Sequence, residues 1–192
     1  RHLPRVDPIL LTHEHKDHLA GLDDIRPIYF MMKEPMRVYG LQRVLNVVHK
    51  DFDYAFKPNP YPGVPALQLF PVRDDPFTIK GVEIQPIHVR HLTLPILGYR
   101  MGKFAYITDG SFIAETELKK LEGLEVLVIN ALRIKEHYSH FNLEQALSII
   151  RRLQPKRAYL THISDKMGLY ADVAPTLPEN VFLGIDEMTI TV

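Results

Sequence analysis

The segment Thr12-His13-Glu14-His15-Lys16-Asp17-His18 follows directly after the apolar run Pro8-Ile9-Leu10-Leu11. Four side chains that favour metal ions fall within six residues of this segment: His13, His15, Asp17 and His18. An apolar run that leads straight into such a cluster is typical of a buried strand that delivers ligands to a protected site. The alternative is a solvated loop that is rich in histidine and charge.

The spacing within this cluster predicts a site for two metal ions. His13 and His15 are two residues apart, so on an extended segment their imidazoles leave the backbone on the same side and can share one ion. If the chain bends into a helix at Lys16, Asp17 and His18 approach from a different direction and can hold a second ion. Imidazole suits zinc, iron and manganese, and an added carboxylate shifts the site towards open, water-carrying hydrolytic chemistry.

The composition narrows the class of protein. The 192 residues, of which 46% are hydrophobic, are enough for one compact domain over residues 1–192. The 23 basic residues equal the 23 acidic ones, which disfavours a nucleic-acid partner and favours a small substrate. There is no cysteine, so histidine and carboxylate are the available metal ligands. No apolar stretch approaches the roughly 20 residues that cross a bilayer, and we expect a cytoplasmic protein without a membrane partner.

Strand and helix patterns alternate along the chain. Strands are expected at 8–12, 36–39, 67–72, 77–79, 82–89, 96–101, 104–108, 126–130, 157–161, 181–183 and 188–192. Helices are expected at 18–22, 25–32 with an interruption at Pro27, 41–52, 115–121 and 143–153. The pattern favours an α/β fold with two mixed sheets packed face to face and helices outside.

Further ligands are needed, because a catalytic ion usually takes three protein ligands and keeps one open position. Asp109 follows the apolar strand pattern 104–108, from which its carboxylate could bridge both ions. The alternative is a turn aspartate that caps the next helix. His162 ends the pattern 157–161, and the carboxyl end of a buried strand is the usual position for site residues in α/β proteins.

Four other histidines compete for the remaining roles. Between His88 and His91 we prefer His91 as a ligand, because it lies past the strand in a loop, and we interpret His88 as a packed histidine or one behind the ligands. His140 precedes the expected helix 143–153, where backbone N–H groups favour an anion, so it is a candidate acid or phosphate contact. His137 is interpreted as a surface residue.

Taken in order, the cluster and the strand-end residues His91, Asp109 and His162 resemble the metallo-β-lactamase fold hydrolases. Within that superfamily, three further parts of the chain resemble the cyclic phosphodiesterases of the carbon-phosphorus lyase pathway. They are His91–Tyr99 (HLTLPILGY), Thr108-Asp109, and the pair His140–Leu143 and Leu160–Ser164. The last pair is also similar to the zinc-dependent tRNA 3′-processing endonucleases.

The resemblance implies an αββα sandwich with a binuclear centre. His13, His15 and His91 would hold one zinc or manganese ion, Asp17, His18 and His162 would hold the other, and Asp109 would bridge them. Asp17 and His140 are the implied catalytic residues, with His140 contacting the phosphate and protonating the leaving oxygen.

These residues predict a hydrolase that cleaves a small, cyclic phosphodiester with a hydroxide activated by two metal ions. The alternatives are a tRNA 3′-processing type of endonuclease, a hydrolase of esters, thioesters or lactams, and an inactive module that keeps only the fold. The chain opens at Arg1, close to the cluster, whereas relatives carry strands before it. We therefore expect an N-terminally incomplete domain whose exposed edges could pair in a homodimer.

Overall fold

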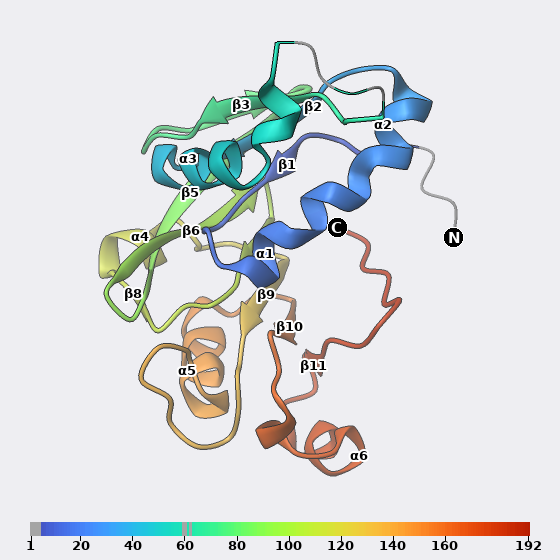
Figure 1. Ribbon diagram of the computed structural model, residues 1–192. Helices are drawn as coiled ribbons and strands as arrows, with labels where there is room; N and C mark the ends of the chain where they lie inside the picture. Colours follow the sequence, from blue (N-terminus) through green and yellow to red (C-terminus); the bar gives the residue numbers. More distant parts are fainter. Residues whose placement is uncertain (1–4, 59–60, 62) are drawn as a thin grey trace. The chain divides into compact units, whose positions relative to one another are not determined.

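The computed structural model describes residues 5–58, 61 and 63–192. The chain divides into two compact units, Arg1–Asp74 and Asp75–Val192, each with its own sheet and its own hydrophobic core (Figure 1). The single domain expected over residues 1–192 stays a prediction, and each unit is described by itself.

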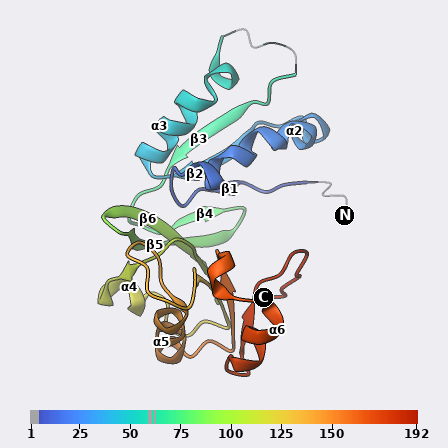
Figure 2. The same ribbon diagram turned by 60° about the horizontal axis from the view of Figure 1, so that its bottom comes forward.

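The first unit contains a small parallel sheet in the order β1-β2-β3. Its strands are β1 (Ile9–Leu10), β2 (Met36–Gly40) and β3 (Leu67–Pro71). Its helices are α1 (Lys16–Leu19), the 3-10 helix η1 (Ala20–Ile25), α2 (Arg26–Met32), α3 (Gln42–Asp51) and the 3-10 helix η2 (Asp53–Phe56). Both ribbon views show α3 alongside the sheet (Figure 2). Val44, Leu45 and Val48 of α3 are buried in the core of this unit with Val38 of β2, as the helical spacing predicts.

Two details of this unit differ from the sequence patterns. The strand expected over 8–12 is only Ile9–Leu10, because the ladder to β2 ends soon after the bond from Leu11 N to Tyr39 O. Pro27 lies in the first turn of α2 and does not interrupt a helix, since the first turn needs no proline N–H.

The second unit contains an eight-stranded mixed sheet in the order β11-β10-β9-β7-β6-β5-β4, with β8 paired to β5. Its strands are β4 (Phe77–Ile79), β5 (Val82–His91), β6 (Leu94–Met101), β7 (Phe104–Ile107), β8 (Phe112–Ile113), β9 (Val126–Asn130), β10 (Arg157–Thr161) and β11 (Val181–Leu183). Its helices are α4 (Glu115–Lys119), α5 (Leu143–Leu153), α6 (Tyr170–Val173) and the 3-10 helices η3 (Asp165–Met167) and η4 (Ala174–Thr176).

Strand direction in this sheet determines where functional side chains emerge. β5, β6 and β7 pair antiparallel in succession, so β5 and β7 run the same way, and β7, β9 and β10 pair parallel. The carboxyl ends of β5, β7, β9 and β10 therefore lie at one edge of the sheet, which is where α/β proteins place their ligands.

Helix α5 begins and ends at the predicted residues. Asn142 accepts a hydrogen bond from Gln145 N at 2.9 Å, and the Gln145 side chain accepts one from Asn142 N at 3.0 Å, which completes a capping box. Ala146, Ile150 and Leu153 form the buried stripe of the helix within the core of this unit.

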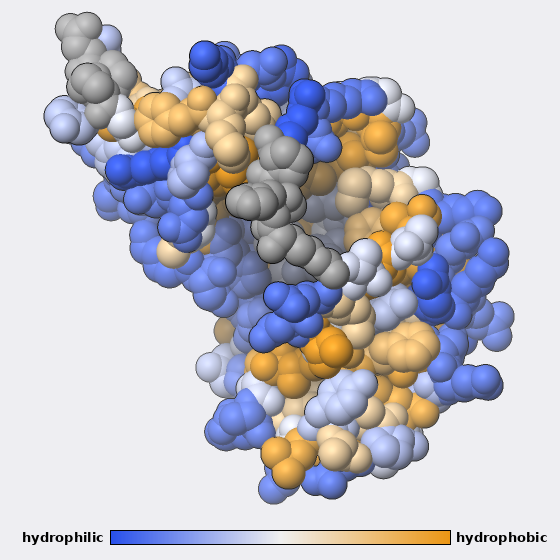
Figure 3. All heavy atoms as spheres, turned by 90° about the vertical axis from the view of Figure 1, so that its right-hand side faces the viewer, coloured by the Kyte–Doolittle hydropathy of each residue, from blue (hydrophilic) through white to orange (hydrophobic). Residues whose placement is uncertain are grey.

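The predicted α/β class, with two sheets and helices, is confirmed. The sheet of the first unit is purely parallel over the described residues, whereas both sheets were expected to be mixed. The strand expected at 188–192 is wrong, since this segment has no regular structure. No helix among the described residues is long and apolar enough to cross a bilayer. The space-filling view shows apolar patches interspersed with polar side chains on one face (Figure 3), an ordinary pattern for a folded protein.

Candidate metal centre

The histidine-rich segment of the first unit lies where β1 passes into α1. His15 is the N-cap of α1 in an extended conformation, and its carbonyl accepts a bond from His18 N at 3.0 Å. The expected bend from strand to helix at Lys16 is therefore present. His13 is fully buried.

The side chains of this segment converge on one another. His13 Nε2 lies 3.1 Å from His15 Nδ1, and the rings of His13 and His18 have centroids 4.2 Å apart. Asp17 Oδ2 lies 3.3 Å from His18 Nε2. His13 Nδ1 lies 3.0 Å from Thr12 Oγ1. If Nδ1 donates its proton to that hydroxyl, the lone pair of His13 Nε2 is available to an ion.

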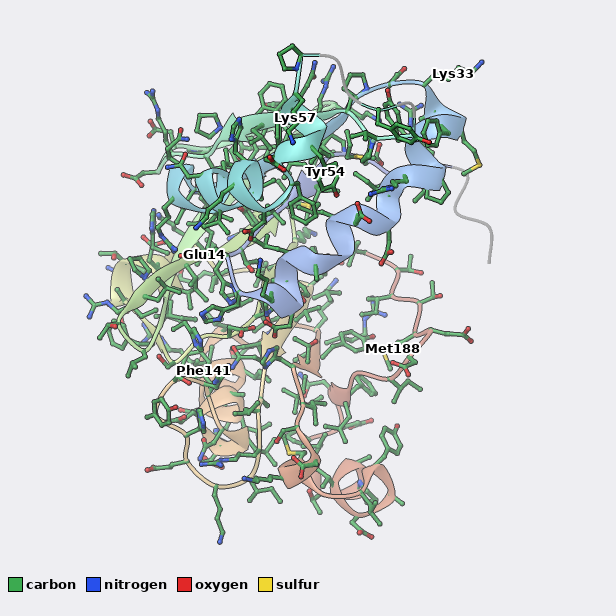
Figure 4. The ribbon with its side chains drawn as sticks, in the orientation of Figure 1. Glu14, Lys33, Tyr54, Lys57, Phe141 and Met188 are labelled. Carbon is green, nitrogen blue, oxygen red and sulfur yellow. The ribbon has the colours of Figure 1, made fainter. Side chains whose placement is uncertain are left out.

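The two charged residues between these ligands, Glu14 and Lys16, point toward α3 and not into the histidine cluster. Glu14 forms an ion pair with Arg43, and Lys16 forms one with Asp51. Figure 4 shows Glu14 on the loop that leads into α1. The carboxylate of Glu14 is thereby engaged outside the histidine cluster, and both ion pairs connect the loop to α3.

In the second unit, the side chains of His162, His140 and Thr108 surround the carboxylate of Asp109. Asp109 is 2% exposed, and its Oδ2 lies 3.2 Å from His162 Nε2 and 3.3 Å from His140 Nε2. Its other oxygen, Oδ1, accepts a hydrogen bond from Thr108 Oγ1 at 2.6 Å. Asp109 follows β7, His162 follows β10 and His140 precedes α5, so residues from three parts of this unit lie close together.

The backbone is strained where these residues emerge. Asp109 has a φ of 57° and His162 has a φ of 53°, and Leu92, next to His91, has a φ of 56°. A residue with a side chain rarely adopts this left-handed conformation, and such residues cluster at functional sites. Asp109 lies two residues past the end of β7, and His162 lies directly past the end of β10.

Asn130, at the end of β9, holds the turn after Asp109. Its Oδ1 accepts a hydrogen bond from Gly110 N at 2.7 Å and its Nδ2 donates one to Gly110 O at 3.0 Å, with all these groups buried. A Cβ on Gly110 would come within 2.8 Å of Phe141 and 2.9 Å of Val89. Figure 4 labels Phe141 beside the loop that enters α5. Only glycine fits this turn without a shift of its neighbours.

His91 is the last residue of β5, paired with Leu94, and does not lie past the strand in a loop as expected. The hairpin ladder extends two residues further than the sequence pattern indicates. Its Nδ1 lies 2.8 Å from the Ser139 carbonyl oxygen, which can only accept, so Nδ1 carries a proton and Nε2 keeps its lone pair for an ion. His88 is half-buried, and its backbone N–H donates to Glu117 Oε2 at 2.8 Å.

Ser139 also determines the proton position on His140. Ser139 N donates to His137 Nδ1 at 3.3 Å, and the Ser139 hydroxyl lies 3.2 Å from the same nitrogen but 2.9 Å from His140 Nδ1. Because Asp109 Oδ2 is a carboxylate oxygen that can only accept and lies 3.3 Å from His140 Nε2, we assign the hydroxyl proton to the bond to His140 Nδ1. That assignment leaves the ring proton of His140 on Nε2, the atom that faces Asp109.

His137, interpreted from the sequence as a surface residue, is partly exposed. Its ring is half-buried, its Nδ1 lies 3.3 Å from His140 Nδ1, and it stacks on Tyr138. Burial lowers the pKa of His137, and the charges of Arg133, His140, His91 and Lys166 lower it further. The three-residue spacing from His140 could have indicated this contact in a turn, but it does not distinguish a turn from an extended loop.

The donor atoms of each unit fit a divalent ion. Ligands on a tetrahedral zinc ion, at about 2.0–2.1 Å, lie about 3.3 Å from each other. The 3.1 Å between His13 Nε2 and His15 Nδ1 and the 3.2 Å between Asp109 Oδ2 and His162 Nε2 match that separation. Within the second unit, His91, Asp109 and His140 also form a group that could hold an ion. The assignment of each residue as ligand or acid stays a prediction.

Comparison with known proteins gives a family and a set of relatives. A family profile described as a β-lactamase superfamily domain matches residues 1–163, which include residues of both units. An octanoyltransferase of Porphyromonas gingivalis is 39% identical over 183 residues, which are 94% of this chain and 37% of that protein. This chain thus spans little more than a third of that relative.

Two solved structures resemble the whole chain. A diphosphatase of the PhnP family is 30% identical with a TM-score of 0.90, covering 99% of this chain and 73% of that one. The short form of human tRNase Z is 19% identical with a TM-score of 0.70, covering 98% of this chain and 80% of that one. At that lower identity the likeness shows the fold alone.

Proposed function

The chain belongs to the β-lactamase superfamily domain family, and from that premise we propose that it is a metal-dependent phosphodiesterase for a small phosphodiester. Membership and the metallo-β-lactamase fold support a hydrolase, and the fold implies divalent metal ions. The proposal adds the substrate class, the number of ions, which is two, and their identity, zinc or manganese.

One observation carries the proposal. A buried carboxylate, Asp109, lies within 3.3 Å of two imidazole nitrogens, and both Asp109 and His162 hold a strained backbone conformation. Burying a carboxylate costs free energy unless the group is paired or coordinates a metal. An ion held by Asp109 together with these histidines would offset that cost. A buried carboxylate and strained backbone conformations at the carboxyl ends of the strands are typical of a functional site.

The proposed ligand set draws on both units. His13, His15 and His91 would hold one ion, Asp17, His18 and His162 would hold the other, and Asp109 would bridge them. The support is chemical: His13 and His91 each have one nitrogen engaged by a neighbouring oxygen, which orients the other nitrogen for coordination.

When bound, two such ions activate a water as nucleophile and neutralise charge on the phosphate. The protein groups then perform the remaining steps. His140 Nε2–H donates a hydrogen bond to the phosphate and protonates the leaving oxygen, while the Ser139 hydroxyl bonded at Nδ1 keeps that proton on Nε2. General acid catalysis of this kind typically contributes about 10² to 10⁴-fold. Asp17 is proposed as the second catalytic residue, a ligand that would orient the nucleophile.

A small substrate is favoured over a structured RNA. The formal net charge is zero, so the protein has no overall field that would attract a polyanion. The similarity to tRNase Z extends to the fold only, and the PhnP-family neighbour is described as a diphosphatase. A small phosphorylated substrate is consistent with both the charge and that neighbour.

Metal analysis combined with a substrate panel tests the proposal. Purified protein should contain about two equivalents of zinc or manganese and should hydrolyse bis(p-nitrophenyl) phosphate in preference to a thioester and a β-lactam. Chelation should abolish turnover, and either ion should restore it. Turnover of the thioester or the β-lactam alone would reassign the reaction to a carbonyl centre, and the absence of metal would favour an inactive module.

A further inference from the structure

A cavity of about 410 Å³ lies in the second unit, away from the residues that surround Asp109. It is lined by Glu83, Gln85, Arg100, Gly102 and Lys120. Gln85 lies near the amino end of β5 and His91 ends the same strand, so the rise of the strand separates them by about 20 Å. The cavity therefore lies at the edge of the sheet opposite to Asp109 and His162, and the proposed reaction uses none of the residues that line it.

The pairing of β5 with β6 brings the residues of this cavity together. Gln85 is the direct partner of Arg100 across the two strands. Glu83 is two residues from Gln85, so both side chains leave β5 on the same face. Gly102 lies in the turn after β6, and a Cβ there would meet nothing within 4 Å. Lys120 is the C-cap of α4. The cavity thus lies between one face of a β-hairpin and the end of a helix.

Arg100 is held in a fixed position by carbonyl oxygens. Its Nε donates to Gly102 O at 2.8 Å, and its Nη1 donates to Lys120 O and, at 2.9 Å, to Glu122 O. A guanidinium has five N–H donors, so the two on Nη2 remain. Within the described part of the chain, Nη2 forms no hydrogen bond and no carboxylate pairs with Arg100. A guanidinium that is already ordered and keeps two N–H groups is suited to bind a carboxylate.

The charge of Lys120 is balanced within the protein. Its Nζ lies 2.8 Å from Glu117 Oε1 and 3.0 Å from Glu117 Oε2. Glu117 is 8% exposed, and its Oε2 also accepts a hydrogen bond from His88 N at 2.8 Å. This bond fixes the carboxylate, which in turn holds the lysine at the wall of the cavity. The positive charge that is left to a ligand is therefore that of Arg100.

Glu83 supplies a negative charge to the same cavity. It is exposed, and among the residues that the structure describes it forms no ion pair with Arg100 or with any other cation. Gln85 Nε2 donates to Pro86 O at 3.1 Å, which leaves the amide oxygen of Gln85 as an acceptor. The cavity thus keeps a cation and an anion apart and adds a neutral acceptor. A ligand with a carboxylate, an ammonium and a further N–H donor would complement all three groups.

We propose that this cavity binds a free α-amino acid with a carboxamide side chain. The ligand carboxylate accepts from the Nη2 N–H groups of Arg100, its ammonium pairs with Glu83, and its amide N–H donates to the side chain of Gln85. The four side chains that line the cavity are all polar, which favours this ligand over an apolar one. The inference goes beyond the proposed function and does not depend on it, because the cavity and the candidate metal centre share no residue.

L-Glutamine and two matched analogues test the site. Glutaramate lacks only the ammonium group of L-glutamine, and 4-aminobutanamide lacks only its carboxylate. Calorimetry on the purified full chain should detect L-glutamine with a Kd of about 1 mM or lower. Both analogues should bind at least about 10-fold more weakly, because each leaves one charge of the cavity unpaired. The absence of L-glutamine binding, or equal binding of the three compounds, would overturn the proposal.

Glu83→Gln tests the anionic group without removing an ion pair of the fold. It should weaken the binding of L-glutamine by about 10-fold, whereas Glu179→Gln, an exposed change before β11, should leave it unchanged. Unchanged affinity in Glu83→Gln would contradict the site. Arg100→Gln should weaken binding by at least as much, and circular dichroism checks its fold, because it also releases carbonyl oxygens at the end of α4. If Arg100→Gln is unfolded, Glu83→Gln still decides. None of these measurements needs turnover, so a failure of the proposed phosphodiesterase leaves them valid.

Discussion

The two units supply metal-binding side chains in opposite ways. In the first unit, His13, His15, Asp17 and His18 share one short loop, and the contacts among them follow from local spacing. In the second unit, His91, Asp109 and His162 come from three strands and meet because those strands end at one edge of the sheet. A contiguous set depends on the conformation of a loop, whereas a scattered set depends on the whole sheet. Substitutions in the two sets should therefore fail differently.

The largest effect is expected at the residue of the scattered set on which the others converge. Asp109→Asn keeps the shape and an acceptor for Thr108 but removes the charge next to His140 and His162. Turnover of bis(p-nitrophenyl) phosphate should fall by about 10³-fold or more, and metal content should drop, because the bridging charge is lost. Plasma emission spectrometry and initial rates measure both. Asp172→Asn, an exposed change on α6, is the control and should alter neither quantity.

The next effect distinguishes an acid from a ligand. His140→Ala should retain the metal and slow turnover by about 10² to 10⁴-fold, since it removes only the proton donor. His13→Ala should instead lose metal as well as activity. Because His91, Asp109 and His140 could themselves hold an ion, metal content decides the matter. Loss of metal from His140→Ala would move His140 into the ligand set.

The same contrast explains what the sequence could predict. The cluster at 13–18 predicts a metal site from sequence, and its closely spaced side chains do converge. Strands β9, β10 and β11 and helix α5 match their expected bounds, because fully apolar or clearly amphipathic patterns with strong caps leave few alternatives. The ends of the apolar patterns also pointed to Asp109 and His162.

Other features could not be predicted, since they depend on neighbours distant in the sequence. Positive φ values at Asp109 and His162 have only a weak signal in residue type, because aspartate and histidine adopt them more often than most residues but far less often than glycine. Ser139 orients His91 and His140 from a loop without periodicity. The sequence pattern identifies Asn130 only as the end of a buried strand. A polar residue at such a position does indicate that its side chain forms hydrogen bonds. The alternating segment 188–192 has the pattern of a strand but no regular structure.

A smaller effect is expected from the turn that aims Asp109. Gly110→Ala places a methyl group within 2.9 Å of Val89 and Phe141, so either the turn or its neighbours must shift. The free energy of unfolding should fall by about 1–3 kcal/mol, with weaker metal binding. Urea denaturation measures the change. The control is Gly21→Ala, where a Cβ meets nothing within 4 Å. Equal stability of the two variants would mean that the turn after Asp109 accommodates a side chain.

The smallest effect is expected from the support of the contiguous set. Arg43→Gln removes the ion pair that holds Glu14 on the side of α3. Partly exposed pairs contribute about 0.2–1 kcal/mol, so stability should change little. The freed Glu14 carboxylate can compete for an ion, and zinc affinity, measured by chelator competition, should change by less than about 10-fold. Arg37→Gln on β2, exposed, is the control. A loss of metal as large as in Asp109→Asn would show that the loop, too, depends on a distant partner, and the contrast between a local and a scattered ligand set would no longer hold.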